Sequence, residues 1–402
     1  MSATLDEEFD EAQRWSPASP AVKPGQDSRW YATKGIVRLL VTNAMYGYSL
    51  ASFFLLPKHL AVSFAATPAQ IGRVTGVLST ASLLCLPILG PVLRRLGYRR
   101  ASVLGFTLMG LGAAAFPLIS RIGIAMLVAR AIQGIAAAVV FTAGLAMSSA
   151  FAPKDKLTQT MGLVGSASLA MGAVAPAIGE PLAERFGFAP VFLLAALAAF
   201  IGAWVSLGLP EGGREPAPAA TPARSRFTAL PLLASLAIVG AGYNVVMAFL
   251  APFALQRGFP VVRGFFISYT LAALFIRLFC GMITDRFGTK RTAAGGIVIY
   301  GLVIAAIGVF GPAHRVLWGF VFGLAHGALF PALMALVFER VSASARGPLA
   351  ALSNSTIHLG MMGVFAFGAL AGHTGFPTVF AIVGSLVGLS ALLVRRRTNT
   401  IP

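Results

Sequence analysis

The chain has 402 residues, of which 57% are apolar and 11% charged, and its formal net charge is +18. Soluble domains carry about 25% charged residues, so this composition excludes a soluble enzyme or a disordered chain and indicates a polytopic membrane protein. The basic residues lie in short clusters between long apolar runs, which is typical of membrane topology signals, so we expect no nucleic-acid partner.

The first segment, residues 1–33, is polar, mixed in charge and contains several prolines. It lacks the apolar core of a signal peptide, so we expect a disordered cytoplasmic tail. Twelve apolar runs follow, each of about the length that crosses a bilayer. The runs cover residues 35–58, 70–93, 101–119, 123–148, 160–183, 189–209, 229–255, 263–284, 292–311, 315–338, 348–371 and 377–394.

Residues 210–227 are rich in proline and alanine and separate the sixth run from the seventh. We therefore expect an N-terminal bundle (34–209), a cytoplasmic linker (210–227), a C-terminal bundle (228–395) and a second cytoplasmic tail (396–402). With both termini inside, the inner loops hold about three times as many Lys and Arg as the outer loops, which favours this orientation. Cys85 and Cys280 lie within apolar runs and suggest neither a disulfide nor a metal site.

The two halves repeat one another. A Gly-rich basic loop follows run two (Gly90 to Arg100), and a similar loop follows run eight (Gly281 to Arg291). Tyr48 and Pro57 in run one correspond to Tyr243 and Pro252 in run seven, and a Gly-Phe-x-x-Val-Phe sequence opens both run six and run twelve. The sequence thus predicts an all-α membrane protein with twelve transmembrane helices in two pseudo-symmetric six-helix bundles.

Three motifs carry a family resemblance. The second-half loop has the pattern G-x-x-x-D-R-x-G-x-K/R-R, formed by Gly281, Asp285, Arg286, Gly288, Lys290 and Arg291. Run four contains Arg130-x-x-Gln133-Gly134, and Ala175-Pro176-x-x-Gly179 in run five is a degraded G-P-x-x-G-G motif. On these residues the chain resembles the major facilitator superfamily of secondary transporters, and most of all its sugar- and drug-efflux members.

The resemblance implies a gating role for the two loops. Glycines at 90, 97, 281 and 288 would let helices approach closely, and Asp285 would accept hydrogen bonds from the N-terminus of a neighbouring helix. Arg286, Lys290 and Arg291 would pair with it or with lipid phosphates. A simple topology anchor is the alternative. Arg94 stands where the first-half loop should have its aspartate, so that half of the latch is expected to be weakened or differently partnered.

Apart from Lys58, Arg73, Arg263 and Arg315, which lie at the outer ends of their runs, four charged residues fall within the predicted spans: Arg38, Arg130, Glu180 and Arg277. Arg38 is near the cytoplasmic end and is expected to snorkel. By resemblance Arg130 serves proton coupling or substrate binding, and a structural hydrogen-bonding role is the alternative; Gln133 at i+3 can share its network. Glu180 is either an interface carboxylate beside Arg185 or a titratable partner of Arg130.

Other polar residues lie in mid-span. By resemblance Arg277 contacts a substrate carboxylate, and runs one, four, seven and ten line the central cavity. The side chains that would line the cavity, or that would only satisfy buried hydrogen bonds, are Asn43, Tyr46, Tyr48, Tyr243, Asn244, Tyr269, His326 and His358.

The sequence predicts a secondary active transporter working by alternating access, which exports a small organic molecule with ion coupling. An exchanger or importer of small organic anions is the alternative, and it gains weight if Glu180 lies outside the cavity. A polytopic membrane enzyme or a receptor is the third class. We expect no enzyme activity and no cofactor. The expected partners are a small-molecule substrate, a proton or counter-anion and the bilayer, and we expect a monomer in a bacterial inner membrane.

Overall fold

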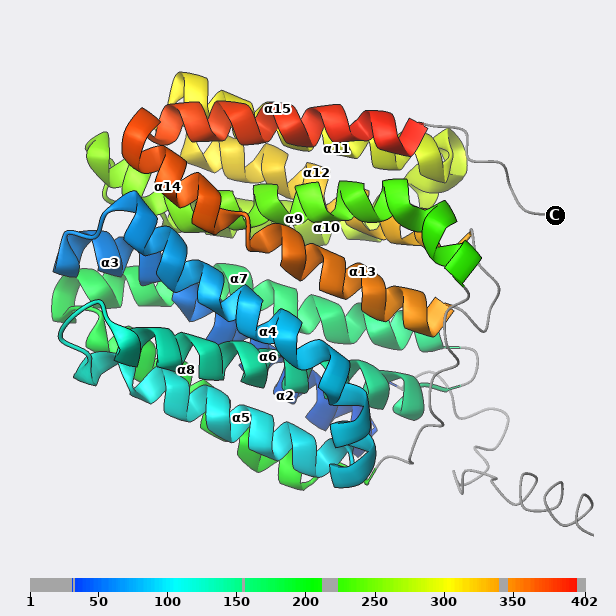
Figure 1. The fold of residues 1–402 in the computed structure, drawn as a ribbon. Coiled ribbons are helices and arrows are strands. Elements are labelled where there is room, and N and C mark those ends of the chain that lie inside the picture. Colours follow the sequence, from blue (N-terminus) through cyan, green and yellow to red (C-terminus); the bar gives the residue numbers. More distant parts are fainter. Residues whose placement is uncertain (1–30, 32, 154–155, 212–222, 340–345, 396–402) are drawn as a thin grey trace, which may run out of the picture.

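The computed structural model describes residues 31, 33–153, 156–211, 223–339 and 346–395, and this part of the chain contains helices and no strand (Figure 1). Twelve of the described segments are long and apolar enough to cross a membrane. The predicted fold class is therefore confirmed. The tails predicted at 1–33 and 396–402, and most of the predicted linker at 210–227, lie outside the described residues.

Six spans form the N-terminal half. They are α2 (Lys34–Ser52) with η2 (Phe53–Leu55) and α3 (Leu56–Phe64), α4 (Pro68–Leu96), α5 (Tyr98–Ala114) with η3 (Phe116–Leu118), α6 (Ile124–Phe151), α7 (Leu157–Phe186) and α8 (Ala189–Leu207). The first span is longer than the predicted 35–58. Pro57 occupies the first turn of α3, where its missing N–H is not needed, so the chain continues as a helix beyond it.

Six further spans form the C-terminal half. They are α9 (Ala223–Gln256), α10 (Arg263–Phe287), α11 (Thr289–Phe310), α12 (Arg315–Phe338), α13 (Arg346–Met361) with α14 (Val364–Thr374), and α15 (Phe376–Arg395). The helix α9 begins at Ala223, inside the segment predicted as linker. The eleventh span is interrupted between α13 and α14, which the apolar pattern did not reveal.

The same five helix pairings build each half, which confirms the predicted repeat. In the N-terminal half α2 packs on α7 and α8, α6 packs on α4 and α5, and α5 packs on α8. In the C-terminal half the corresponding helices make the corresponding pairs: α9 with α13 and α15, α12 with α10 and α11, and α11 with α15. The two bundles are therefore related by an approximate two-fold axis.

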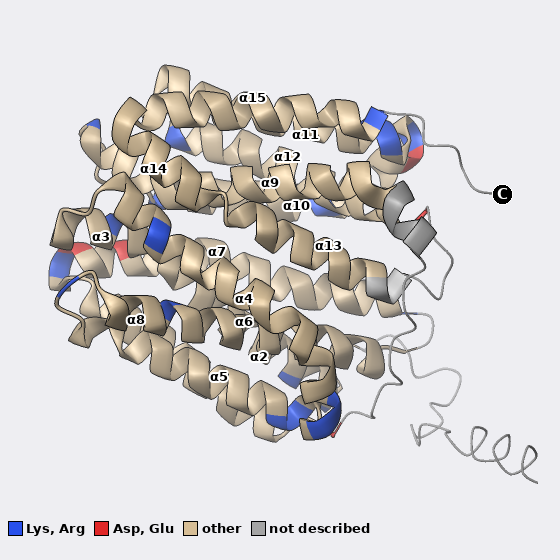
Figure 2. Cartoon of the chain, in the orientation of Figure 1, with Lys and Arg blue, Asp and Glu red and all other residues tan. Residues whose placement is uncertain are grey.

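Large apolar side chains cover the outside of the bundles. Leu84, Trp204, Leu278 and Leu302 are among those that stay 65–79% exposed. A soluble protein rarely exposes so many large apolar side chains, whereas lipid tails solvate them. Figure 2 shows that Lys and Arg gather at the ends of the helices, with few along the spans.

The two ends of the molecule differ. We call the end where α2 begins and α15 ends the terminal end, and the opposite end, where α3 meets α4, the distal end (Figure 1). Between the halves, α4 packs on α13 and α14, and α7 packs on α10. The tightest of these contacts lie toward the distal end. A Cβ added at Gly72 would lie 2.6 Å from the carbonyl oxygen of Val364, so this contact requires glycine.

A second distal contact joins the first and eighth spans, where the rings of Phe54 and Phe266 stack with their centroids 5.3 Å apart. By contrast, Gly97, Gly281 and Gly288 at the terminal end have no heavy atom near enough to meet an added Cβ. The structure therefore has its two halves closed against each other at the distal end.

Candidate functional site

An aromatic cluster around His326 on α12 occupies the interior of the C-terminal half. The hydroxyl of Tyr269 lies 3.1 Å from Nδ1 of His326. The rings of Tyr243 and Tyr300 stack on the imidazole with centroids 5.4 and 5.7 Å away, and Phe322 lies at 6.3 Å. Four helices, α9 to α12, supply these rings. The sequence pointed to three members of this cluster and missed Tyr300 and Phe322, which read as ordinary core residues.

Arg277 lies beside this cluster, about two turns along α10 from Tyr269. Its charge is close enough to act on both Tyr269 and His326. Its Nε is buried and makes no hydrogen bond within the described part of the chain. A buried donor without a partner carries a desolvation cost, so it marks a place where a ligand or water completes the structure.

His358 on α13 has a similar unpartnered nitrogen. Its Nδ1 is buried without a hydrogen bond to any described residue. The side chain itself is half-buried and lies just before the break between α13 and α14. Among the predicted site residues in the described part of the chain, Arg277 and His358 are therefore the two with a fully buried side-chain nitrogen that makes no hydrogen bond.

Asn244 makes a hydrogen bond at the break between α13 and α14. Its Nδ2 donates a hydrogen bond of 2.7 Å to the carbonyl oxygen of Met361, the last residue of α13. Carbonyl groups at a helix end have no partner within the helix, so the amide satisfies one of them. This contact fits the structural alternative for Asn244.

The predicted network of Arg130 and Gln133 on α6 is confirmed. Nη1 of Arg130 donates to Oε1 of Gln133 at 2.8 Å, and its Nε lies 3.4 Å from the carbonyl oxygen of Val74 on α4. The guanidinium also lies 5.3 Å from the ring centroid of Phe53. Both polar side chains are buried, at 6% and 2% exposure. Arg130 thus has neutral partners, and none of its recorded partners is a carboxylate.

The predicted residues on α2 are placed close to α6. Asn43 donates to the carbonyl oxygen of Leu39 on its own helix at 2.9 Å and lies against Gly144. Tyr46 is buried, and its ring centroid lies 6.4 Å from that of Phe141. Tyr48 is half-buried on the same helix.

The two pairings considered for Glu180 are both wrong. Its carboxylate is fully buried and bonds to Lys58 Nζ at 2.5 Å and to the backbone N–H groups of Val262 and Arg263. The partners come from α3 and from the start of α10, far away in the chain. They are neither Arg185 nor Arg130, so Glu180 stands apart from the Arg130 network.

Lys58 is the main charged residue that the sequence reasoning missed. The first run predicted from the sequence ends at this residue, yet α3 extends to Phe64 and the side chain is only 5% exposed. The available signal was its position one residue after Pro57, which begins a helical turn and so carries the lysine into the bundle. Arg38, by contrast, is exposed near the terminal end and donates to the carbonyl of Gly208.

The glycines of the two loops were expected to let helices approach closely, and the structure shows a different arrangement. Gly97 and Gly288 have φ of 78° and 83°, so each allows a sharp reversal between two helices that other residues rarely adopt. Gly281 has nothing within 4 Å of an added Cβ, and Gly90 meets only the Nη1 of Arg94. In this state Gly97 and Gly288 shape turns, Gly90 and Gly281 lie within α4 and α10, and none of the four brings two helices into close contact.

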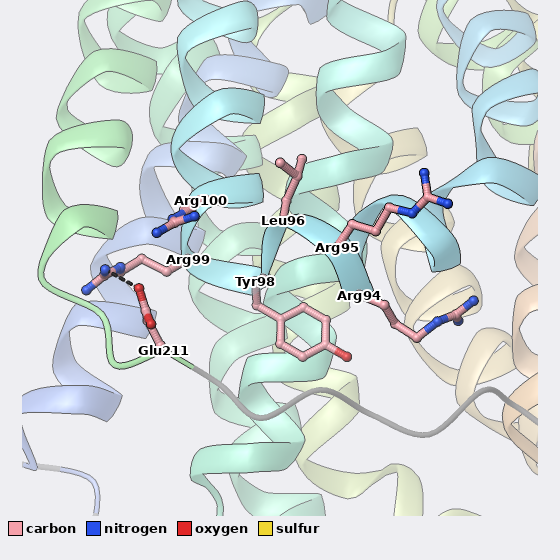
Figure 3. Close-up of a pocket in the computed structure, with 8 residues that line it drawn as sticks. Arg94, Arg95, Leu96, Tyr98, Arg99, Arg100 and Glu211 are labelled. Atoms are coloured by element: carbon pink, nitrogen blue, oxygen red, sulfur yellow. Dashed lines mark hydrogen bonds and ion pairs between the residues drawn. The ribbon is translucent and has the colours of Figure 1, made fainter.

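The first-half loop forms a basic pocket at the terminal end (Figure 3). Its lining includes Arg94, Arg95, Arg99 and Arg100. Arg99 forms an ion pair with Glu211, whereas Arg94 and Arg95 point the other way (Figure 3). This pocket lies at the protein surface and is separate from the interior site.

The second-half loop is exposed. Asp285 makes no hydrogen bond or ion pair within the described residues, so the contact expected with a neighbouring helix terminus is not formed in this state. Arg286 lies over the ring of Phe287, and Arg291 is exposed while Lys290 is half-buried. Within the described residues no group of three His, Cys, Asp or Glu side chains could hold a metal ion.

Twelve apolar spans in two equivalent bundles are the architecture found in many secondary transporters. The chain matches the sequence model of the Major Facilitator Superfamily over residues 39–275 and 264–400. It therefore belongs to this superfamily.

Its relatives include transporters of several kinds. The synaptic vesicular amine transporter of Rattus norvegicus is 27% identical over 339 residues, covering 78% of this chain, and the chain spans 64% of that relative's length. The multi-drug resistance efflux pump PmrA of Streptococcus pneumoniae is 24% identical over 274 residues, which are 61% of this chain and 66% of the pump.

Solved structures share the fold. The nucleoside transporter NupG matches with a TM-score of 0.72 and 16% identity, over 89% of this chain and 98% of that one. A POT family transporter in complex with a peptide conjugate matches with a TM-score of 0.77 and 12% identity, over 90% and 95%.

Proposed function

We propose that the chain is a secondary active transporter that exchanges small organic anions with an aromatic or flat apolar part. The observation that carries this proposal is the charge of the interior. Arg130 and Arg277 lie within the bundles, whereas the carboxylate closest to mid-span among the described residues, Glu180, is bound at the distal end. A buried positive charge without a counter-charge favours a ligand that brings one.

Arg277 and the His326 cluster suit the two parts of such a ligand. The Nε of Arg277 is buried without a hydrogen-bond partner, a carboxylate or similar anion would supply one, and a guanidinium binds a carboxylate through two parallel bonds. The rings of Tyr243, Tyr269 and His326 offer an apolar and aromatic wall beside it. Arg130 is occupied by Gln133 and supplies a second positive charge on the opposite half.

Export of an uncharged or cationic aromatic molecule is the second candidate, and the similarity to an efflux pump and to amine transporters favours it. The stacked tyrosines could hold a cation over their faces. Arg277 would then repel the same cation, so this reading predicts that its loss improves or spares transport.

Counterflow in proteoliposomes tests the proposal. Vesicles loaded with an unlabelled aromatic carboxylate should accumulate the labelled compound without a pH gradient, and the matched methyl ester should neither drive nor inhibit this exchange. Arg277→Gln should reduce the exchange at least about 100-fold, because one bidentate charged contact contributes about 3 kcal/mol. Arg257→Gln, which removes an exposed arginine at the distal end, is the control.

Uptake of an amine, unchanged or increased in Arg277→Gln, would favour the second candidate. If neither anions nor amines exchange while a pH gradient drives transport of a neutral compound, the anion proposal is wrong.

The charge distribution further supports an inner-membrane orientation with both termini in the cytoplasm. A cysteine introduced at Ala217, in the predicted linker, should resist a membrane-impermeant thiol reagent applied to intact cells. Efficient labelling there would contradict this orientation.

A further inference from the structure

The carboxylate of Glu180 joins the two halves of the transporter. Glu180 lies on α7 in the N-terminal half, and it accepts hydrogen bonds from the N–H groups of Val262, at 2.9 and 3.0 Å, and of Arg263, at 2.7 Å. These groups belong to the start of α10 in the C-terminal half. The first N–H groups of a helix have no partner within it, and the helix dipole favours a negative charge there.

Lys58 completes the arrangement. Its Nζ lies 2.5 Å from Glu180, and both side chains are withdrawn from solvent, at 7% and 0% exposure. The guanidinium of Arg263 lies 3.8 Å from Glu180 and 3.6 Å from Glu184, which is itself 44% exposed. Two positive and two negative groups therefore balance, and only the inner pair is shielded from water.

We propose that Lys58, Glu180 and the N-terminus of α10 form a distal lock, which holds the transporter closed at the distal end and must open once in every transport cycle. The lock touches no part of the proposed substrate site, so its residues act as positioning residues. The inference rests on the superfamily's alternating access and not on the anionic substrate proposed above.

The arrangement allows the distal end to open without leaving a buried charge unpaired. Lys58 and Glu180 both belong to the N-terminal half, so they remain paired with each other when the halves separate. The bonds to the backbone of Val262 and Arg263 break, together with the ion pairs of the Arg263 side chain with Glu180 and Glu184, and water entering from the distal side can replace them. The charged pair is thus never left uncompensated, which is the expensive outcome for buried charges.

The sequence shows why this chain has the lock. Glu180 follows Gly179, at the position where the G-P-x-x-G-G motif has its last glycine. A glycine there has no side chain to reach α10. The substitution of a carboxylate at this one position therefore supplies the inter-half bond, and Lys58 supplies its counter-charge.

The test measures the populations of the two states. On a background with Cys85→Ala and Cys280→Ala, spin labels at Leu118 and Phe310 report the distal end, and labels at Leu157 and Phe287 report the terminal end. All four side chains are exposed, at 85%, 70%, 43% and 54%. Double electron–electron resonance in lipid nanodiscs then gives the distance distributions of the full chain without substrate.

The expected result is a shift between states. Glu180→Gln should raise the ratio of distal-open to distal-closed molecules at least about tenfold, which corresponds to about 1.4 kcal/mol and is less than one charged hydrogen bond contributes. The double variant Lys58→Met with Glu180→Met should shift it similarly, and it removes the charges without leaving one unpaired, so folding is retained.

Glu184→Gln is the matched comparison, because it removes a carboxylate one turn away on the same helix, whose contact with α10 is a partly exposed ion pair with the Arg263 side chain and not a bond to the backbone of α10. It should change the ratio by no more than about fivefold, since a partly exposed ion pair contributes about 0.2–1 kcal/mol. The proposal is overturned if the double variant folds and keeps the wild-type distance distributions at both ends, or if Glu184→Gln shifts them as much as Glu180→Gln.

Discussion

The distal and terminal ends of this transporter use charge in opposite ways. At the distal end a buried carboxylate bridges the halves, with a lysine and two backbone N–H groups as its partners. At the terminal end Asp285 is exposed and unpartnered within the described residues, and Arg94 replaces the aspartate expected in the other loop. A buried and fully satisfied charge holds a contact, whereas exposed charges contribute little. The comparison explains why the structure is closed at the distal end.

The largest effect is expected from a substitution whose side chain forces α4 and α14 apart at the distal end. Gly72→Leu places a side chain where an added Cβ already lies 2.6 Å from the Val364 carbonyl oxygen, a backbone atom that cannot move away. We expect the distal ends to be forced apart and exchange in vesicles to fall by up to about 100-fold, since overpacking typically costs about 1–3 kcal/mol. Gly35→Leu, where an added Cβ meets nothing within 4 Å, is the control. Wild-type exchange in Gly72→Leu would show that close approach of α4 and α14 is not needed.

Asp285→Asn should have the next largest effect. Asp285 has no partner in the distal-closed state, so we expect the stability of this state to be unchanged. If the carboxylate serves the terminal-closed state, transport should fall about tenfold or more, because a charged contact contributes about 1.5–3 kcal/mol. Exchange assays at matched expression, together with thermal unfolding, measure both quantities. A normal transport rate would mean that the loop is only a topology anchor.

Arg94→Asp should favour closure at the terminal end. It gives the first-half loop the carboxylate that the second-half loop has at Asp285. We expect a modest increase, about twofold to fivefold, in molecules closed at the terminal end, since an exposed charge contributes about 0.2–1 kcal/mol. Spin labels at Leu157 and Phe287 would detect it as a shorter distance. An unchanged or longer distance contradicts the view that the missing aspartate weakens the latch.

The smallest effect is expected from the exposed ion pair at the terminal end. Glu211→Gln removes the partner of Arg99, whose side chain is 35% exposed, while that of Glu211 is 62% exposed. The free energy of unfolding should change by less than about 1 kcal/mol, and salt should abolish the difference. Thermal unfolding at low and high ionic strength measures this. A larger or salt-independent change would show that the loop contributes more to stability than its exposure suggests.

Part of the candidate site could be read directly from the chain. Arg130 and Gln133 are three residues apart on one helix, so helical geometry alone brings them together, and their hydrogen bond was expected. The mid-span position of Arg277 and His326 likewise follows from counting along the apolar runs. Their grouping with Tyr243 and Tyr300 was not readable, because the four helices that carry these rings meet through packing and not through spacing.

Glu180 shows the limit most clearly. Its sequence neighbours suggested Arg185, and its depth suggested Arg130, yet its partners lie 122 and 82 residues away in the chain. Depth along a span does not give the direction in which a side chain points, and the rotation of each helix is fixed by its packing. The burial of Lys58 was missed for a related reason, since the span continues as a helix beyond Pro57.

The sequence by itself determined the membrane location, the twelve spans and the internal repeat, because the cost of placing charges in lipid and the length needed to cross it act on each segment separately. It also determined the family, through short loop and helix motifs. Only the tertiary structure decided which end of the molecule is closed and which charged groups hold that end closed. Those contacts join different halves of the chain, and the N-terminus of α10 becomes a partner for Glu180 only when both helices are packed side by side.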